Sequence, residues 1–316
     1  MWIADFFAVM KRMILILAVL LASLAPLLGA SRTGLLVPAY FSPHQGDGWT
    51  KLIDAAKRGV SVVAVMNPDV GPGMKVDQTY VKAIADLKKA GGRVVGYVFT
   101  KQGLRNPVHV LEDITRYHEF YPGLAGIFVD QMPTAETFEK LDNRKPSPHR
   151  EKFQMLGAKF KKSEGKGSAR QTMTEYYYRI WVHSKALKSE WLVVGNPGGH
   201  PDEKFFKEKT ADLFVTYAGY DGYDTYQTPA WLKRERGKET AHLISDVSEA
   251  EDMAKRVAAA KAHGVSWLYV TDDGGGNPWD TLPAYWDEEL AQLGAGKGKS
   301  SSEPKKKRSF FFRKRK

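Results

Sequence analysis

The sequence contains no cysteine, and this absence excludes several kinds of site. Without a thiol the chain has no disulfide framework, no thiolate zinc site and no cysteine nucleophile. A phosphate-binding glycine motif is also missing, because residues 38–41 read Pro-Ala-Tyr-Phe and the glycines at 71–73 and 274–276 lack its spacing. No histidine-rich cluster is visible, and the adjacent Asp272 and Asp273 have no third ligand. The sequence therefore predicts neither a metal nor a cofactor.

Most of the chain lacks an excess of either charge. The 316 residues include 47 Lys and Arg against 36 Asp and Glu, which gives a net charge of +11. Residues 294–316 hold ten basic residues and one Glu, so they carry +9 of this charge, and residues 31–293 are nearly neutral. Nucleic-acid binders present basic residues on a folded surface with base-reading elements, so no nucleic-acid partner is predicted.

The C-terminal segment is a predicted tail. Its Gly- and Ser-rich start is typical of a flexible linker. Three phenylalanines at 310–312 stand among the basic residues. Charge and inserted aromatic rings together favour attachment of residues 297–316 to an anionic membrane or wall surface. The alternative is a solvated tail without a role.

The N-terminal apolar run is shorter than the roughly 20 residues that a membrane span needs. Lys11 and Arg12 precede an apolar stretch over 13–29, which ends in small residues. This pattern predicts a signal peptide over residues 1–30, with Ser31 as the first mature residue and a secreted or extracytoplasmic protein. An uncleaved membrane anchor is the alternative.

Between the ends, short apolar runs alternate with helical patterns. The runs are continuous, which is typical of parallel strands covered on both faces. We predict strands at Leu35–Tyr40, Val62–Asn67, Val94–Phe99, Ala125–Asp130, Leu192–Asn196, Leu213–Tyr217, His242–Asp246 and Trp267–Asp272. Helices are expected at Trp49–Arg58, Tyr80–Ala90, Val108–Tyr121, Met173–Lys188 and Glu249–His263. Eight such repeats indicate one α/β domain over 31–293, a (β/α)8 TIM-type barrel, whereas a doubly wound sheet lacks its glycine motif.

A long segment over 132–169 interrupts this alternation after the fourth strand. It is rich in Pro and Lys. In a barrel such a segment either covers the active site or is a surface insertion, and we favour the surface insertion because loops accept insertions at little cost.

The ends of the predicted strands carry aromatic, amide and carboxylate side chains. Functional groups of a barrel gather at the C-terminal strand ends. The candidate catalytic residues are Asp130, Asp272 and Asp273. The candidate substrate-binding residues are Tyr40, His44, Asn67, Tyr97, Gln131, Asn196, Tyr217 and Trp279. Rings that stack on sugars, beside amides and carboxylates that bind hydroxyls, indicate a polysaccharide substrate or ligand.

Some of these residues also have purely structural interpretations. Asp272 and Asp273 are typical of turn caps, and Asn67 and Asn196 precede prolines that end strands. Asp130 is the strongest candidate, because a carboxylate at the end of an apolar strand has little structural reason to be there. His242 is expected at the start of the seventh strand, on the far side of the barrel.

Several segments together resemble one known family. They are Gly-Leu-Leu-Val-Pro-Ala-Tyr-Phe at 34–41, Gly-Ile-Phe-Val-Asp at 126–130, Val-Val-Gly-Asn-Pro-Gly at 193–198, and Val-Thr-Asp-Asp at 270–273 with Asn-Pro-Trp-Asp-Thr-Leu-Pro at 277–283. Over about residues 34–290 the chain is similar to the spherulation-specific family 4 (spherulin-4-like) proteins. The resemblance implies a (β/α)8 barrel related to glycoside hydrolase family 135, whose activity is endo-hydrolysis of α-1,4-linked N-acetylgalactosamine in galactosamine-containing exopolysaccharide.

The chain departs from this family at two positions. Active members show Asp-Glu at the end of the fourth strand and a Glu two residues after the Thr that ends the sixth. Here Asp130 and Thr216 are kept, but the two Glu positions hold Gln131 and Ala218. Glycosidic hydrolysis ordinarily needs two carboxylates, and neither Gln nor Ala can act as one. The protein is thus either a hydrolase that uses an aspartate after the eighth strand or a non-catalytic glycan-binding protein of the cell surface.

Overall fold

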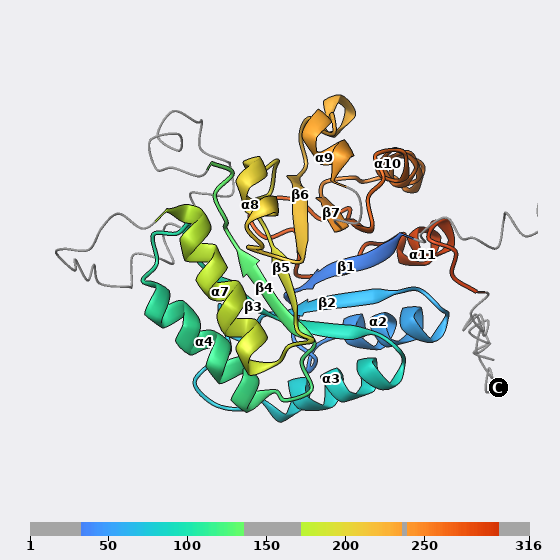
Figure 1. Cartoon of the computed structure of the whole chain (residues 1–316). Helices are drawn as coiled ribbons and strands as arrows, with labels where there is room; N and C mark the ends of the chain where they lie inside the picture. The colour runs from blue at the N-terminus through green and yellow to red at the C-terminus, as the bar shows by residue number, and fades with distance from the viewer. Residues whose placement is uncertain (1–32, 136–171, 236–238, 297–316) are drawn as a thin grey trace, which may run out of the picture.

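Eight parallel strands close into a barrel in the computed structural model, which describes residues 33–135, 172–235 and 239–296 (Figure 1). The strands are β1 (Gly34–Ala39), β2 (Val62–Met66), β3 (Arg93–Phe99), β4 (Gly126–Asp130), β5 (Leu192–Gly195), β6 (Leu213–Gly219), β7 (Glu239–Ile244) and β8 (Trp267–Val270). Each strand pairs with the next, and β8 pairs with β1 to close the ring. The predicted (β/α)8 fold is confirmed.

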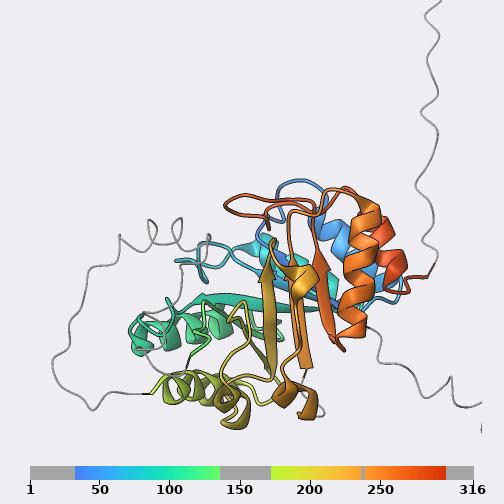
Figure 2. The same ribbon diagram turned by 90° about the horizontal axis from the view of Figure 1, so that it is seen from above.

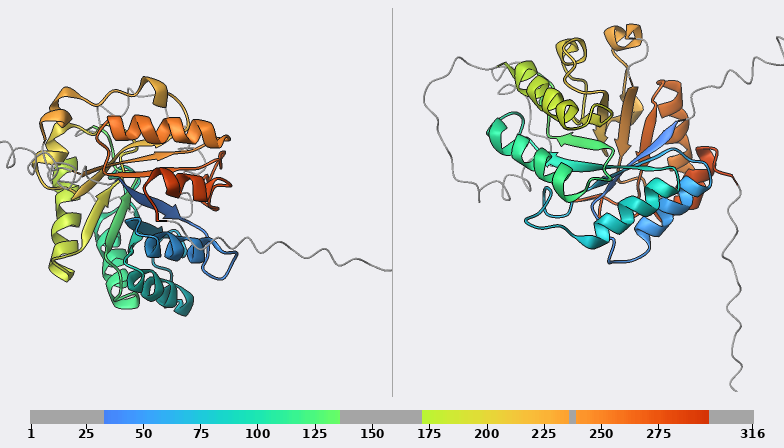
Figure 3. Two further views of the ribbon diagram at one scale, coloured as in Figure 1. Left: turned by 90° about the vertical axis from the view of Figure 1, so that its right-hand side faces the viewer. Right: turned by 60° about the horizontal axis from the view of Figure 1, so that its bottom comes forward.

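Helices cover the outside of the barrel on all sides (Figure 3). They are α2 (Gly48–Lys57), α3 (Gln78–Lys89), α4 (Pro107–Phe120), α7 (Met173–Leu187), α8 (Glu203–Lys207), α9 (Ala230–Arg234), α10 (Ala250–Ala262) and α11 (Trp286–Gln292), with a 3₁₀ turn η2 (Tyr223–Thr225). The five predicted helices are present within two residues at each end, whereas α8, α9, α11 and η2 were not predicted. In the part of the chain that is described, no helix has the length and apolar character to cross a bilayer.

Local sequence signals explain where several helices begin. The Asp77 side chain accepts a hydrogen bond from the main-chain N–H of Thr79 at the start of α3. At the start of α7, Thr172 and Glu175 form a reciprocal capping box. The last two helices, α10 and α11, pack side by side, and α10 also packs against β8 (Figure 2).

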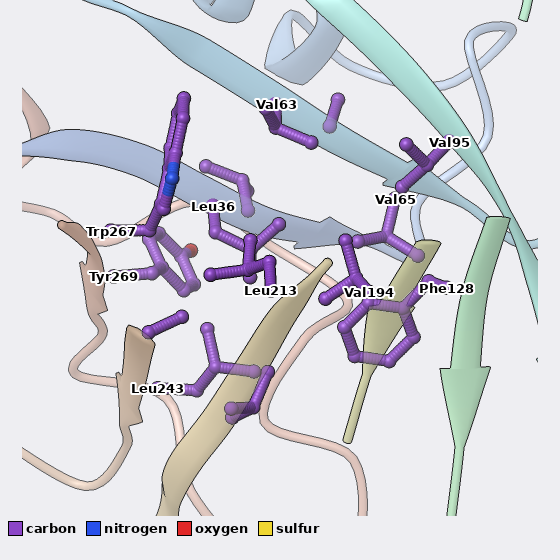
Figure 4. Packing of buried hydrophobic residues seen from close by; sticks show 14 of the residues in the cluster. Leu36, Val63, Val65, Val95, Phe128, Val194, Leu213, Leu243, Trp267 and Tyr269 are labelled. Carbon is purple, nitrogen blue, oxygen red and sulfur yellow. The ribbon is translucent and has the colours of Figure 1, made fainter. Parts of the chain in front are cut away.

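The barrel interior is filled with side chains from all around the ring (Figure 4). Alternate strand residues point inward, among them Leu36, Val65, Phe128, Leu213 and Tyr269, each of them buried. The intervening residues are buried under the helices, which is why the strands read as continuous apolar runs.

Strand β6 contains a bulge that changes which residues face the interior. Val215 pairs with Ala241, but Tyr217 pairs with His242, so Thr216 is an extra residue in β6. Side chains alternate between the two faces of a strand, so one extra residue reverses the alternation beyond it. Ala218 consequently points into the barrel mouth, while Tyr217 packs outside the wall against Tyr223 and His242.

Strand β7 begins three residues earlier than the sequence suggested. It starts at Glu239, whose carboxylate accepts a hydrogen bond from the indole N–H of Trp267 on the neighbouring strand. The expectation that His242 starts this strand is therefore wrong, because it lies in the middle of β7 and is buried outside the barrel wall. The polar first residues hid this start in the sequence.

Three predicted segments fall largely outside the described residues: the signal peptide over 1–30, the insertion over 132–169 and the tail from 294. Only the first residues of the tail are described. The main-chain N–H of Gly296 donates to the carbonyl of Arg58 at 2.9 Å, and Ala295 packs against the core. The chain therefore stays in contact with the barrel through residue 296.

Candidate functional site

A cavity of about 150 Å³ opens at the C-terminal ends of the strands. Its lining comes from β1, β4, β6 and β7 and from the connections that follow β1, β3, β4, β5 and β8. Functional sites of this fold lie at this end of the barrel. Five of the predicted site residues line the cavity: Tyr40, Asp130, Gln131, Asn196 and Trp279.

Asp130 is the polar centre of this cavity. Its side chain is almost completely buried at the end of β4, and both carboxylate oxygens accept hydrogen bonds. The Tyr97 hydroxyl donates to Oδ2 at 2.8 Å, and the Asn196 side-chain amide donates to Oδ1 at 2.7 Å. Asn196 in turn accepts a hydrogen bond from the main-chain N–H of Gly198 at 3.1 Å, which fixes the orientation of its amide. Donors from β3 and from the residue that follows β5 therefore hold the carboxylate in one position.

The two tyrosines beside Asp130 remain protonated. Burial raises the pKa of Tyr97 well above its usual value, and the Asp130 carboxylate raises it further. The pKa of Tyr40 is raised for the same two reasons, in the same order. The two rings meet edge to face with centroids 5.5 Å apart. Tyr97 is thus a lasting hydrogen-bond donor, while the Tyr40 ring supplies part of the cavity wall.

Asp272 and Asp273 do not line the cavity. Asp272 accepts from the main-chain N–H of Ala284 at 2.9 Å, and Asp273 accepts from the N–H of Gly274 at 2.8 Å. Both carboxylates thus stabilise the connection from β8 to α11, as turn-capping residues do. Among the residues that the structure describes, Asp130 is the only carboxylate in the cavity lining.

The base of this connection holds another buried acid. Glu289 of α11 is completely buried, and its Oε1 accepts a hydrogen bond from the main-chain N–H of Val270 at 2.9 Å. Its Oε2 has no hydrogen-bond partner in the described part of the chain. Burial raises the pKa of Glu289 to about 8, so the side chain is mostly a neutral acid at pH 7.

The other predicted binding residues lie away from the cavity lining. Asn67 accepts from the N–H of Gly71 and holds the turn after β2. His44 is exposed, with its Nε2 3.8 Å from a carboxylate oxygen of Asp77. Tyr217 packs on the outer face of β6, and Tyr97 lies beneath Asp130.

Sequence reasoning missed several lining residues. They are Pro38, Gln102, Phe128, Met132, Pro197, Gly198, Leu243 and the loop residues Gly276, Asn277 and Pro278. Inward alternation from Asp130 would have found Phe128, two residues earlier on β4. No group of three or more His, Asp or Glu side chains in the described ranges is arranged to hold a metal ion.

With this geometry established, comparison with known proteins assigns the family. The model of spherulation-specific family 4 matches residues 34–293. The chain belongs to this family. Spherulin-4 of Physarum polycephalum is 27% identical over 274 residues, which are 83% of this chain and 70% of that protein.

Solved structures show the same fold as this family 4 member. The crystal structure of Aspergillus clavatus Sph3 in complex with GalNAc matches with a TM-score of 0.61 and 20% identity, over 84% of this chain and 98% of that one. The catalytic domain of the major endoglucanase from Xanthomonas campestris pv. campestris matches with a TM-score of 0.51 and 13% identity, over 84% and 94% of the two chains.

The resemblance implies a glutamate at residues 131 and 218 of this family 4 member. Both residues face the cavity. Gln131 and Ala218 each belong to the lining. Gln131 has a φ of 54°, a left-handed conformation that non-glycine residues adopt rarely and that is often found at functional sites. At these two positions the cavity is therefore lined by an amide and a methyl group.

Proposed function

We propose that this protein binds a galactosamine-containing polysaccharide in the barrel cavity and hydrolyses it weakly or not at all. The observation that carries the proposal is the composition of the cavity. Asp130 remains buried and held by two donors, while Gln131 and Ala218 stand where the resemblance implies carboxylates.

The lining suits a sugar ring. Trp279 and Tyr40 offer aromatic surface for the apolar face of a pyranose. Asp130 and the amide groups of Gln131 and Asn196 offer hydrogen-bonding groups for hydroxyl or acetamido substituents. The structural similarity to Sph3, whose structure was solved with GalNAc, supports an amino sugar as the ligand.

Hydrolysis has weaker support. Glycosidases ordinarily use two carboxylates, about 5–5.5 Å apart for retention or about 6.5–9.5 Å apart for inversion. Asp272 and Asp273 are engaged in the β8–α11 connection and do not line the cavity, which argues against either of them as the second group. We therefore favour the binding hypothesis over a hydrolase with a substitute carboxylate.

A titration calorimetry experiment tests the proposal. Oligomers of α-1,4-linked N-acetylgalactosamine are titrated into the protein, and release of reducing ends is followed in the same samples. We expect binding that Trp279→Ala weakens and that Tyr178→Ala leaves unchanged, because Tyr178 lies exposed on α7 outside the cavity lining. Absence of binding would refute the proposal, and family-typical turnover would show that a second carboxylate comes from elsewhere in the chain.

Export and surface attachment are part of the same proposal. A signal peptide over 1–30 would deliver the barrel outside the cytoplasm, and the +9 charge of residues 294–316 would hold it near an anionic membrane or wall polymer. The intact mass of exported protein tests the first step, since a mature chain should begin at Ser31.

A further inference from the structure

We propose that Thr100 is a positioning residue, whose hydroxyl fixes the main chain that presents Asp130 and Gln131 to the cavity. Thr100 follows β3 directly, is completely buried and does not belong to the cavity lining. Its role would be exerted entirely through the end of β4. The affinity readout below rests on the proposed glycan binding.

The Thr100 hydroxyl joins three groups. Its Oγ1 lies 2.7 Å from the carbonyl oxygen of Asp130 and 3.0 Å from that of Gln131. The Tyr177 hydroxyl on α7 lies 2.8 Å from the same Oγ1. A threonine hydroxyl has one proton to donate, and the two carbonyls share this proton. The oxygen of the same hydroxyl accepts a hydrogen bond from the Tyr177 hydroxyl. The main-chain N–H of Thr100 also donates to the Asp130 carbonyl, at 3.2 Å.

The main chain at this point needs such support. Gln131 has a φ of 54°, and Lys101 and Gln102 on the facing connection have φ values of 52° and 56°. Left-handed conformations of non-glycine residues persist only where their surroundings over-determine them. The N–H of Gln102 donates to the Gln131 carbonyl at 2.8 Å, so the two strained segments support each other across Thr100.

The carboxylate and its main chain are therefore held by different residues. Tyr97 and Asn196 orient the Asp130 side chain, whereas Thr100 holds the carbonyls of both residues at the end of β4. Loss of the Thr100 hydroxyl would leave each of these carbonyls with a single main-chain N–H donor and would loosen both cavity side chains together.

Three variants separate this role from a merely structural one. Thr100→Val keeps the shape and removes the hydroxyl, Thr100→Ser keeps the hydroxyl, and Thr210→Val is a matched control. The Thr210 hydroxyl is also buried and donates to a main-chain carbonyl, that of Phe205, at 2.9 Å and outside the cavity lining.

For each variant we would measure the melting temperature, the dissociation constant for the N-acetylgalactosamine oligomer and hydrogen exchange at the Gln102 amide. Thr100→Val should weaken binding by about tenfold, because each of the two carbonyls keeps only its main-chain N–H partner and the end of β4 is held less firmly. It should also speed exchange at Gln102. Thr100→Ser should keep the dissociation constant and the exchange rate at Gln102 within about twofold of the wild-type values, since its hydroxyl makes the same bonds. Thr210→Val should lower the melting temperature and leave affinity and Gln102 exchange unchanged.

Two results would overturn the proposal. One is a Thr100→Val protein whose melting temperature is lowered, as in Thr210→Val, but which binds glycan with wild-type affinity. The other is unchanged exchange at Gln102 in Thr100→Val, which decides the question even if the wild-type protein binds no glycan and the proposed function fails.

Discussion

The ends of β4 and β8 look alike in sequence but differ in what holds their carboxylates. Asp130 accepts hydrogen bonds from Tyr97 and Asn196, which belong to the strand on one side and the strand end on the other. Asp272 and Asp273 accept theirs from the main chain of the connection that follows them. The carboxylate tied across strands lines the cavity, whereas those tied to their own loop shape that loop.

The strand ladder explains this difference. Asp130 is still within β4 and pairs in register with Phe99, so its inward direction is fixed. Strand β8 ends at Val270, and the two aspartates follow beyond the ladder. Their direction is set by the turn that they cap. The two strand ends should therefore differ in how they respond to substitution and to pH.

The largest effect is expected from restoring carboxylates at the β4 side. The double change Gln131→Glu with Ala218→Glu should raise reducing-end release from the polymer by about 10²–10⁴-fold, the usual contribution of a general acid or base. Adding Asp130→Asn to this variant should abolish the gain. If the double variant binds glycan but hydrolyses no faster, the cavity does not hold these side chains as a glycosidase needs them.

The β8 side should respond to pH through stability. The pKa of Glu289 is about 8 in the folded protein and 4.5 in the unfolded chain. Between these values the folded state binds more protons, so the free energy of unfolding falls as pH rises, by up to about 1.4 kcal/mol per pH unit. Glu289→Gln should remove this loss and make the protein more resistant to urea at pH 9 than the wild type.

The control for this prediction is Glu288→Gln, which changes an exposed neighbour on the same helix. It should leave the pH dependence as in the wild type. Urea unfolding at pH 5, 7 and 9 provides the measurement, and parallel curves for wild type and Glu289→Gln would show that Glu289 ionises normally.

A direct contrast of the two ends should give smaller effects. Asp130→Asn places an amide against two fixed donors and should weaken glycan binding by about tenfold or more. Asp272→Ala should cost about 1 kcal/mol of stability through the lost bond to the Ala284 N–H, without changing affinity. Calorimetric titration and urea unfolding measure the two quantities. Reduced affinity in Asp272→Ala would mean that the β8 carboxylates reach the ligand after all.

The smallest effect concerns the tail. A chain that ends at Gly296 should melt at nearly the wild-type temperature, whereas one that ends at Leu293 loses the bond to the Arg58 carbonyl and should be slightly less stable. Both truncations should weaken attachment to anionic vesicles. Attachment of the full chain should fall with rising salt, since charges are screened over about 8–10 Å at physiological ionic strength. Salt-independent attachment would contradict a charge-based role.

The sequence was sufficient for the barrel and for the carboxylate at the centre of the cavity. Continuous apolar runs identified the strands because both faces of each strand are buried. Asp130 stood out because a carboxylate ended such a run. The sequence could not show which group Asp272 binds, because an aspartate that caps a turn and an aspartate that binds a ligand can stand at the same position. The orientation of Tyr217 was also missed, since the bulge at Thr216 leaves no signal in residue type.

That bulge has a consequence for how the cavity can change over time. Because Thr216 is the extra residue, its deletion would let Tyr217 follow Val215 in regular alternation, with Tyr217 still outside the wall and Ala218 still in the cavity lining. Insertions and deletions in strands are usually regarded as damage to a fold. Here the loss of one residue from β6 would remove the bulge and keep the same side chains in the cavity wall.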